Sequence, residues 1–369
     1  MNSQKKKVLI GMSGGVDSSV AAALLIEKGY ECIGIYMNLW ADPVEVDLDE
    51  RKKFPQNKCC SIESLIFARS ICQKLGMPFY SLNLEQKFKE QVVDNFLDEH
   101  RAGNTPNPCV RCNKTIKFGE LFRKMEELGC DYLATGHYAT LKEEDGRVSL
   151  LRGVDDTKDQ TYFLYNLNQN KLKKLIFPIG EYNKTEVKEL AKKYGLKELE
   201  NKKESQGVCF YPEKLYFPFL GRHLKAKQDY KEGKIQTKDG EEMGDHKGLP
   251  FYTIGQRKGI GVGGQENPVY VNKIDKIKNV LIVGNEEELY SDEVLLRDAN
   301  FLTGEEPSTS EVFDIKIRTH GKLAKGTITK EGKLYRVKFK EAQRAIMAGQ
   351  SLVLYRGKEL IGGGIMTME

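Results

Sequence analysis

The sequence lacks any long apolar run and any strong excess of one charge. No stretch of its 369 residues approaches the roughly 18 consecutive apolar residues of a membrane span, so we predict no membrane segment. Lysine and arginine total 58 against 53 acidic residues, a formal net charge of +5. This mild excess permits a nucleic-acid partner but does not require one, because many proteins that bind no nucleic acid share it.

An export signal is also missing. The polar start, Met1 to Lys7, is followed by a short apolar run, Val8 to Met12, which leads into a glycine loop. We therefore expect a cytoplasmic protein whose eight cysteines are thiols of a reducing compartment. In that setting the thiols are candidates for metal binding or catalysis rather than for a disulfide framework.

Apolar spacing in the first half predicts alternating strands and helices. Short apolar runs are typical of buried strands, and longer segments with apolar residues at helical spacing are typical of amphipathic helices. Their alternation indicates an α/β fold with a doubly wound, mostly parallel sheet. The expected strands are 7–12, 32–37, 78–82 and 132–135, and the expected helices are 18–27, 61–75, 86–99, 118–128 and 183–194.

The second half has a different pattern. After about Glu204, short alternating segments divided by Gly and Pro are typical of β-strands. We therefore divide the chain into an α/β domain, 1–204, and two small β-rich domains, 205–284 and 285–369. Two proline-containing stretches of the first domain, 38–58 and 100–113, are predicted to be loops. The expected later strands are 233–237, 268–274, 280–283, 312–319, 326–329, 335–339 and 351–355.

The strongest local motif is a glycine-rich loop between the first strand and the first helix, GMSGGVDSS. Gly14 and Gly15 permit backbone conformations that turn N–H groups toward phosphate oxygens, and the helix N-terminus adds positive charge. The loop lacks the G-K-[ST] ending of a Walker motif and does not match the dinucleotide fingerprint. Asp17 is a poor phosphate ligand, so we interpret it as a ligand of the Mg²⁺ that accompanies a nucleotide.

The cysteines offer a second candidate site. Cys109 and Cys112 form a single C-x-x-C in the segment TPNPCVRCN, and Cys209 lies in SQGVCF. A lone C-x-x-C is compatible with zinc, redox or iron–sulfur chemistry, and also with coincidence. A structural zinc site needs four ligands, and the sequence lacks a second C-x-x-C to supply them. The remaining cysteines are expected to be structural: Cys32, Cys59, Cys60, Cys72 and Cys130.

Together these motifs resemble those of the tRNA-specific 2-thiouridylases over essentially the whole chain. The resemblance implies an ATP pyrophosphatase domain of the adenine-nucleotide alpha-hydrolase-like type, a central β-rich domain and a C-terminal barrel-like domain. It implies 2-thiolation of the wobble uridine in tRNAs for Lys, Glu and Gln, through an adenylated uridine, with release of AMP and pyrophosphate. The segments that carry it are GMSGGVDSSV, TPNPCVRCNKTIKFG, DYLATGHYA, KDQTYFL, SQGVCF, LPFYTIGQRKGIGVGG, AQRAIMAGQ and GGGI.

The resemblance also assigns functions to individual residues. Cys112 would be the nucleophile and Cys209 would carry sulfur as a persulfide, so that the two end each cycle as a disulfide. ATP would contact Gly11, Met12, Ser13, Gly14, Gly15, Val16, Asp17, Ser18, Met37 and Gly136. The target base or the rest of the tRNA would contact Asn107, Pro108, Cys109, His137, Lys158, Asp159, Gln160, Thr319, His320 and Gln350.

One position departs from the family pattern. The first residue of the C-x-x-C, commonly aspartate in the family, is Cys109 here. Cys109, Cys112 and Cys209 could then gather around an iron–sulfur cluster, because thiolates suit such clusters. Two sulfur routes therefore stay open, a persulfide relay and a cluster. The expected cofactors are ATP and Mg²⁺, with the cluster as an alternative, and the expected partners are tRNA and a sulfur donor such as a cysteine desulfurase or a persulfide carrier.

Two other classes of protein compete with this interpretation. Amidotransferase-type and argininosuccinate synthetases share the phosphate loop but have no need of Cys112 and Cys209. An RNA-binding module with a structural metal site would bind tRNA without releasing AMP.

Overall fold

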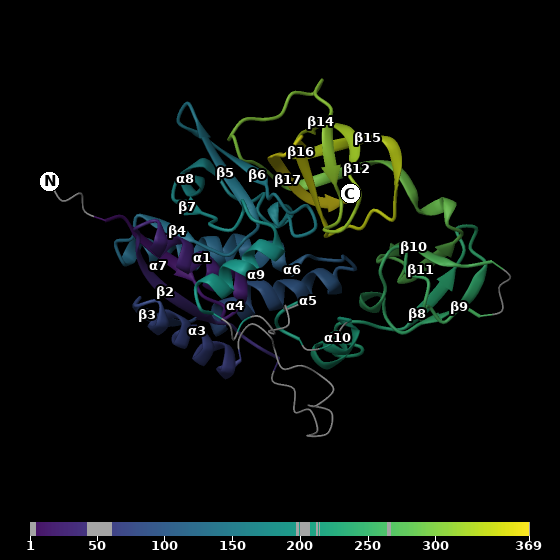
Figure 1. The fold of residues 1–369 in the computed structure, drawn as a ribbon. Coiled ribbons are helices and arrows are strands. Elements are labelled where there is room, and N and C mark those ends of the chain that lie inside the picture. The colour runs from purple at the N-terminus through teal and green to yellow at the C-terminus, as the bar shows by residue number, and fades with distance from the viewer. Residues whose placement is uncertain are drawn as a thin grey trace.

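The computed structural model describes residues 5–42, 61–196, 199, 207–211, 213, 215–263 and 267–368. Figure 1 shows a first body that contains β1 to β4 and their helices, a barrel beside β5 and β6, and a separate sheet that contains β8 to β11. Most of the predicted loop 38–58, together with Cys59 and Cys60, lies outside the described residues. Within them, no helix combines the length and the apolar composition needed to cross a bilayer.

The first body is built on a parallel sheet, as predicted. Its strands lie in the order β3-β2-β1-β4-β7, and every neighbouring pair is parallel. Strand β1 is central, and its residues Val8, Leu9 and Ile10 are fully buried because they alternate between two helix layers. The strands are β1 (Lys7–Gly11), β2 (Glu31–Asn38), β3 (Phe79–Asn83), β4 (Tyr132–Ala134) and β7 (Leu175–Ile176).

Helices cover both faces of this sheet. Val8 and Ile10 pack on the face covered by α1 (Val16–Glu27), α3 (Ile62–Lys74) and α9 (Lys184–Lys193). Leu9 points the other way, toward α7 (Leu121–Glu127). The predicted helix 183–194 is confirmed as α9, and a capping box formed by Asn183 and Glu186 begins it. Shorter helical segments are η3 (Thr161–Phe163) and α8 (Gln169–Leu172).

The prediction of a loop over 100–113 was partly wrong. A continuous helical stretch begins at Pro108 as α6 (Pro108–Cys112), continues through the π-helical η2 (Asn113–Glu120) and ends as α7. Asn107 accepts a hydrogen bond from the Val110 N–H at 3.3 Å, and Pro108 takes the first helical position, where no N–H is needed. The prolines that indicated a loop therefore mark a helix start, and both cysteines lie on this helix.

A second π-helical turn interrupts the predicted helix 86–99. This stretch forms α4 (Glu85–Phe88), η1 (Lys89–Val93) and α5 (Asp94–Arg101). The turn packs against α6, so the two irregular helical stretches lie side by side.

A small mixed sheet forms the middle of the chain. Its strand order is β10-β11-β8-β9, in which only β8 and β11 are parallel. The elements are α10 (Phe217–His223), β8 (Gly233–Gln236), β9 (Glu242–His246), η5 (Leu249–Phe251), β10 (Tyr270–Asp275) and β11 (Val280–Gly284). Strand β9 and helix α10 were not predicted, since both are rich in charged residues or glycine and proline.

The last part of the chain is a closed antiparallel barrel. Its strands run in the order β12-β15-β14-β13-β16-β17, and β17 pairs back onto β12. The elements are η6 (Glu287–Leu289), β12 (Tyr290–Phe301), β13 (Phe313–Lys316), β14 (Ala324–Glu331), β15 (Leu334–Arg344), β16 (Ser351–Arg356) and β17 (Glu359–Thr367). Strand β17 was missed because of its glycines, which close packing requires: a Cβ on Gly363 would lie 2.5 Å from the Leu352 carbonyl oxygen.

An unpredicted hairpin joins the first body to the barrel. It consists of β5 (Ala139–Glu144) and β6 (Arg147–Arg152), and Leu151 of β6 pairs with Glu359 of β17. The two bodies therefore share one sheet (Figure 1). The charged sequence LKEEDGR conceals the hairpin, because its outer end faces solvent.

Candidate active site

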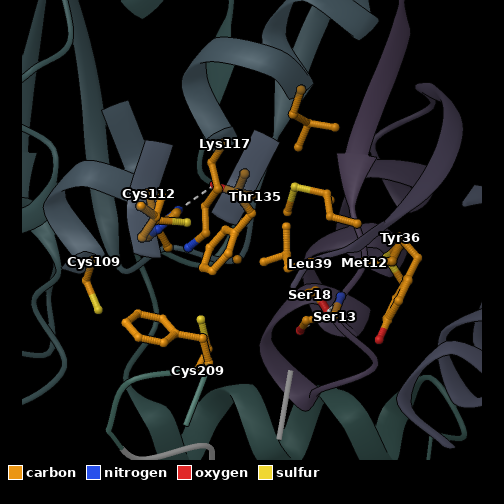
Figure 2. Close-up of a pocket in the computed structure, with 18 of the residues that line it drawn as sticks. Met12, Ser13, Ser18, Tyr36, Leu39, Cys109, Cys112, Lys117, Thr135 and Cys209 are labelled. Carbon is orange, nitrogen blue, oxygen red and sulfur yellow. Dashed lines mark hydrogen bonds between the residues drawn. The ribbon is translucent and has the colours of Figure 1, made fainter. Parts of the chain in front are cut away.

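One cavity of about 350 Å³ opens at the carboxyl ends of β1, β2 and β4, where parallel sheets bind ligands. It contains residues of the phosphate loop on one side and all three candidate cysteines on the other (Figure 2). The predicted site residues that line it are Gly11, Met12, Ser13, Asp17, Ser18, Met37, Pro108, Cys109, Cys112, Gly136, His137, Gln160 and Cys209.

The phosphate loop has the predicted special backbone conformation at Gly14, whereas Gly15 is in an ordinary extended conformation with φ of −92°. Gly14 has φ of +71°, and a Cβ there would lie 2.6 Å from the Ser64 carbonyl oxygen, so no other residue fits without movement. The Gly15 carbonyl accepts hydrogen bonds from the Ser18 and Ser19 hydroxyls at 3.2 and 2.9 Å. Gly15 and Val16 continue the loop into α1, which directs its N-terminus at the cavity and favours an anion there.

Gly136, at the end of β4, is explained by a close approach to this loop. A Cβ on it would lie 2.8 Å from the Ser18 backbone nitrogen and 2.9 Å from the Asp17 carbonyl carbon. A larger residue would push the loop away from the sheet, so Gly136 keeps the nucleotide end of the cavity open.

Asp17 is held by two partners that the sequence did not reveal. Its carboxylate accepts hydrogen bonds from Lys184 at 2.7 and 3.0 Å and from the Tyr138 hydroxyl at 2.8 Å. Lys184 is the first residue of α9, and the Asn183 cap fixes this helix start. Lys184 was missed because it is distant in sequence; its only signal was its position at a capped helix start.

Magnesium fits this site only as part of a nucleotide complex. Across the described ranges, no group of three or more His, Cys, Asp or Glu side chains is placed to hold a metal ion. One carboxylate together with nucleotide phosphates is a usual set of Mg²⁺ ligands. Asp17 therefore fits a magnesium ion that arrives with ATP.

The cysteine end of the cavity is formed by α6 and by the segment 207–211. Cys112 is buried, whereas Cys109 and Cys209 are partly exposed (Figure 2). The Cys209 segment is fixed by its neighbour Phe210, which is fully buried and whose carbonyl accepts a hydrogen bond from the Asp42 N–H at 3.0 Å. None of the three forms a disulfide in this structure.

The iron–sulfur alternative does not fit this arrangement. Cys109, Cys112 and Cys209 line the same cavity. Among the described residues, however, no three His, Cys, Asp or Glu side chains, these cysteines included, are placed to hold one metal ion.

The other described cysteines are structural, as predicted. Burial raises the pKa of the Cys32 thiol to about 11 and that of Cys72 to about 12, and it also raises the pKa of Cys130. These thiols are therefore protonated and unreactive at neutral pH.

His137 lies in the cavity wall as a neutral side chain. Burial, and then the positive charge of Lys117, hold its pKa well below the usual range. Its Nδ1 is 2.7 Å from the Thr135 hydroxyl, and its ring packs against Phe118 and Phe177. These contacts fix the ring, so His137 shapes the cavity without contributing charge.

Of the predicted tRNA-contact triad 158–160, the structure brings only Gln160 into the cavity. The Asp159 side chain is fully buried and forms ion pairs with Arg152 at 3.3 Å and with Lys316 of the barrel at 3.8 Å. Asp159 thus connects the first body to the barrel, and Lys158 lies beside it, partly exposed.

The remaining predicted residues lie outside the cavity. Gln350 donates hydrogen bonds to the carbonyls of Thr105 and Pro106 at 2.8 and 3.2 Å, so the barrel supports the segment before α6. Asn107 caps α6. Thr319 and His320 form an accessible turn after β13.

Three family models match the chain in succession. They describe a tRNA methyl transferase HUP domain at residues 6–213, a tRNA methyl transferase PRC-barrel domain at 218–285 and an aminomethyltransferase beta-barrel domain at 291–366. A tRNA-specific 2-thiouridylase MnmA from Clostridium botulinum (strain Alaska E43 / Type E3) is 45% identical over 369 residues, with 99% of each chain covered. The chain belongs to the tRNA-specific 2-thiouridylase family.

A second thiouridylase, from Clostridioides difficile (strain 630), is 44% identical over 367 residues, with 98% of each chain covered. Likeness to solved structures is much weaker. An NMN synthetase from Francisella tularensis is 13% identical with a TM-score of 0.32, over 55% of this chain and 67% of that one. The family assignment therefore depends on the thiouridylases, whose coverage includes the phosphate loop and the cysteine segments.

Proposed function

We propose that the protein uses ATP to replace the C2 oxygen of the wobble uridine of tRNA with sulfur, in the cytoplasm. The observation that carries this proposal is that one cavity contains both the phosphate loop and the Cys112 and Cys209 thiols. A nucleotide-activating site and a sulfur-transfer site that share a cavity suit a reaction in which activation and sulfur attack occur at one atom. The tRNAs for Lys, Glu and Gln are the proposed substrates.

Activation would take place at the phosphate-loop end. The C2 carbonyl of uracil is a poor electrophile, and its adenylation converts the oxygen into part of a good leaving group, AMP. The loop N–H groups and the start of α1 favour the charge that moves onto pyrophosphate. Mg²⁺, when bound with ATP near Asp17, would supply further charge neutralisation.

Sulfur transfer would take place at the cysteine end. Cys209 carries a persulfide received from a donor such as a cysteine desulfurase or a persulfide carrier. The Cys112 thiolate attacks the Cys209 sulfur, which forms a Cys112–Cys209 disulfide and releases hydrosulfide. Hydrosulfide attacks C2, the C2–O bond breaks, AMP leaves with the electron pair, and one proton is lost. A thiol reductant then restores the two cysteines.

The target base must leave the anticodon loop to reach this cavity, because a stacked base does not expose C2 to a buried thiol. Pro108 and Cys109 line the cavity together with Cys112, and we propose that the flipped uridine lies against them. Lys158, Thr319 and His320, which are partly or fully exposed, are proposed to contact the tRNA outside the cavity.

The test is a thiolation assay with unmodified tRNA, ATP and a persulfide donor, with AMP and 2-thiouridine measured together. We expect Cys112→Ser and Cys209→Ser each to abolish 2-thiouridine formation while ATP binding stays within about twofold, because neither thiol belongs to the phosphate loop. Thiolation that survives both substitutions would contradict the proposal and favour another synthetase with this loop.

Iron and acid-labile sulfide, measured on anaerobically purified protein, separate the two sulfur routes. An iron-free protein that thiolates tRNA supports the persulfide relay. Stoichiometric iron that is lost together with activity in Cys109→Ala would replace the relay with a cluster.

A further inference from the structure

Lys117 contributes the only positively charged side chain among the described residues that line the cavity. Asp17 is the only carboxylate in that lining, and its charge is matched by Lys184. His137 is neutral and contributes none. In the proposed reaction, the cavity nevertheless receives strongly anionic groups, namely the ATP phosphates and the reacting sulfur.

The irregular helix is what brings Lys117 to this side. In a regular α-helix, a residue five positions after Cys112 would point about 140° away from it. Residues 113–120 instead form a π-helical stretch, whose hydrogen bonds connect residues five apart. Cys112 and Lys117 consequently both line the cavity. π-Helical stretches are rare in proteins and frequently lie at functional sites, so the presence of one between these two residues points to function.

Neighbouring charges do not neutralise Lys117. On the same helical stretch, Glu120 is engaged by Lys87 and Arg123. Along the described chain, no carboxylate lies within ion-pair distance of the Lys117 ammonium. In Figure 2 its side chain lies between the cysteines and the serines of the phosphate loop. A half-buried cation in this position favours an anion that arrives with the substrates.

We infer that Lys117 is a further catalytic residue of the proposed thiolation, and that its ammonium contacts the phosphate of the adenylated uridine. When hydrosulfide attacks C2, a C–S bond forms and the C2–O bond breaks, so the electron pair moves onto the AMP phosphate oxygen. Lys117 stabilises that developing charge while Lys184 and Asp17 act at the pyrophosphate end. The inference rests on the proposed function and adds the residue that assists departure of AMP.

The experiment compares Lys117→Met, Lys117→Arg and Lys124→Met. Lys124 lies on the same continuous helix, outside the cavity, in a partly exposed ion pair with Glu127, so its loss controls for charge removal. We measure ATP affinity by calorimetry, and single-turnover rates of 2-thiouridine and AMP formation at saturating tRNA. Lys117→Met is expected to lower the rate about 10²- to 10³-fold with ATP affinity nearly unchanged, as for removal of other transition-state donors.

Lys117→Arg keeps the charge, and we expect its rate to be at least about tenfold higher than that of Lys117→Met. Such a recovery also excludes a folding defect as the cause of the lower rate. Rates for Lys117→Met within about threefold of Lys124→Met would overturn the inference while leaving thiolation itself intact. A rate loss explained entirely by weaker ATP binding would overturn it as well. A wild-type protein that forms no 2-thiouridine would overturn the proposed function, and this inference with it.

Discussion

At the scale of single residues, the site combines one carboxylate, Asp17, with two lysines, Lys117 in the cavity lining and Lys184 at the carboxylate. Lys184 is paired with Asp17 at 2.7 Å, which neutralises the carboxylate before ATP arrives. Because Asp17 and Lys184 contact each other, the loss of either one leaves a partly buried charge without its partner. We propose that a magnesium nucleotide binds at this pair, with its cation replacing the lysine at the carboxylate.

Lys184→Met should therefore impair the nucleotide step. We expect AMP formation to fall about 10²-fold, because a charged donor at the pyrophosphate end is lost. Lys188→Met, which removes an exposed lysine from the same helix, is the matched control and should change little. Calorimetric titration with ATP and Mg²⁺, together with the AMP assay, checks this; equal effects of the two substitutions would contradict it.

At the scale of elements, the capped start of α6 positions two of the three cysteines. Asn107 and Pro108 begin the helix, and Gln350 of the barrel holds the two carbonyls just before it. The first turn of α6 thus has support from both its own cap and a neighbouring body. A small displacement there would move both Cys109 and Cys112.

Asn107→Ala removes this cap and should cost about 1 kcal/mol of unfolding free energy. Asn168→Ala removes the cap of α8, none of whose residues lines the cavity, and should cost about the same. Only Asn107→Ala should also lower the thiolation rate, since α8 carries no site residue. Urea denaturation and the tRNA assay check this, and similar thiolation rates for the two variants would show that the α6 cap does not position the site.

Element prediction from sequence succeeded where apolar spacing and caps coincide, and it failed where other forces decide. The buried strands β1 and β2 and the capped helix α9 were predicted nearly to the residue. The hairpin β5–β6 was not, because its charged sequence hides the strand alternation and its contact with the distant β17 cannot be inferred from local sequence. The phosphate loop and the cysteines were found from motifs. Lys117 reaches the cavity through a π-helical stretch, and Lys184 reaches Asp17 from a distant helix, which no local pattern indicates.

At the scale of the whole molecule, Asp159 connects the first body to the barrel. Its fully buried side chain forms ion pairs with Arg152 of β6 and Lys316 of β13 and accepts hydrogen bonds from Thr161. We propose that the chain divides into domains near residues 204 and 284. The first and last of these domains are joined by a shared sheet and by a buried charge cluster.

Asp159→Asn should therefore destabilise the protein by about 3–5 kcal/mol, because it leaves two cations without their buried partner. Asp156→Asn removes an exposed carboxylate that pairs with the same Arg152, and it should cost less than about 1 kcal/mol. Chemical denaturation of both variants checks the difference. A small cost for Asp159→Asn would mean that water or relaxation of the barrel compensates the two cations.

The hairpin β5–β6 has a consequence for the order of events during synthesis. Strand β6 pairs with β17, which leaves the ribosome about 200 residues later. At bacterial-type rates of about 5–20 residues per second, roughly 10–40 s pass in which β6 has no partner. Charged residues such as Lys142, Glu143 and Glu144 at the outer end of the hairpin make it a poor template for pairing with other nascent chains in that interval. The charges that conceal the hairpin from sequence analysis are thus the ones that protect it until the end of translation.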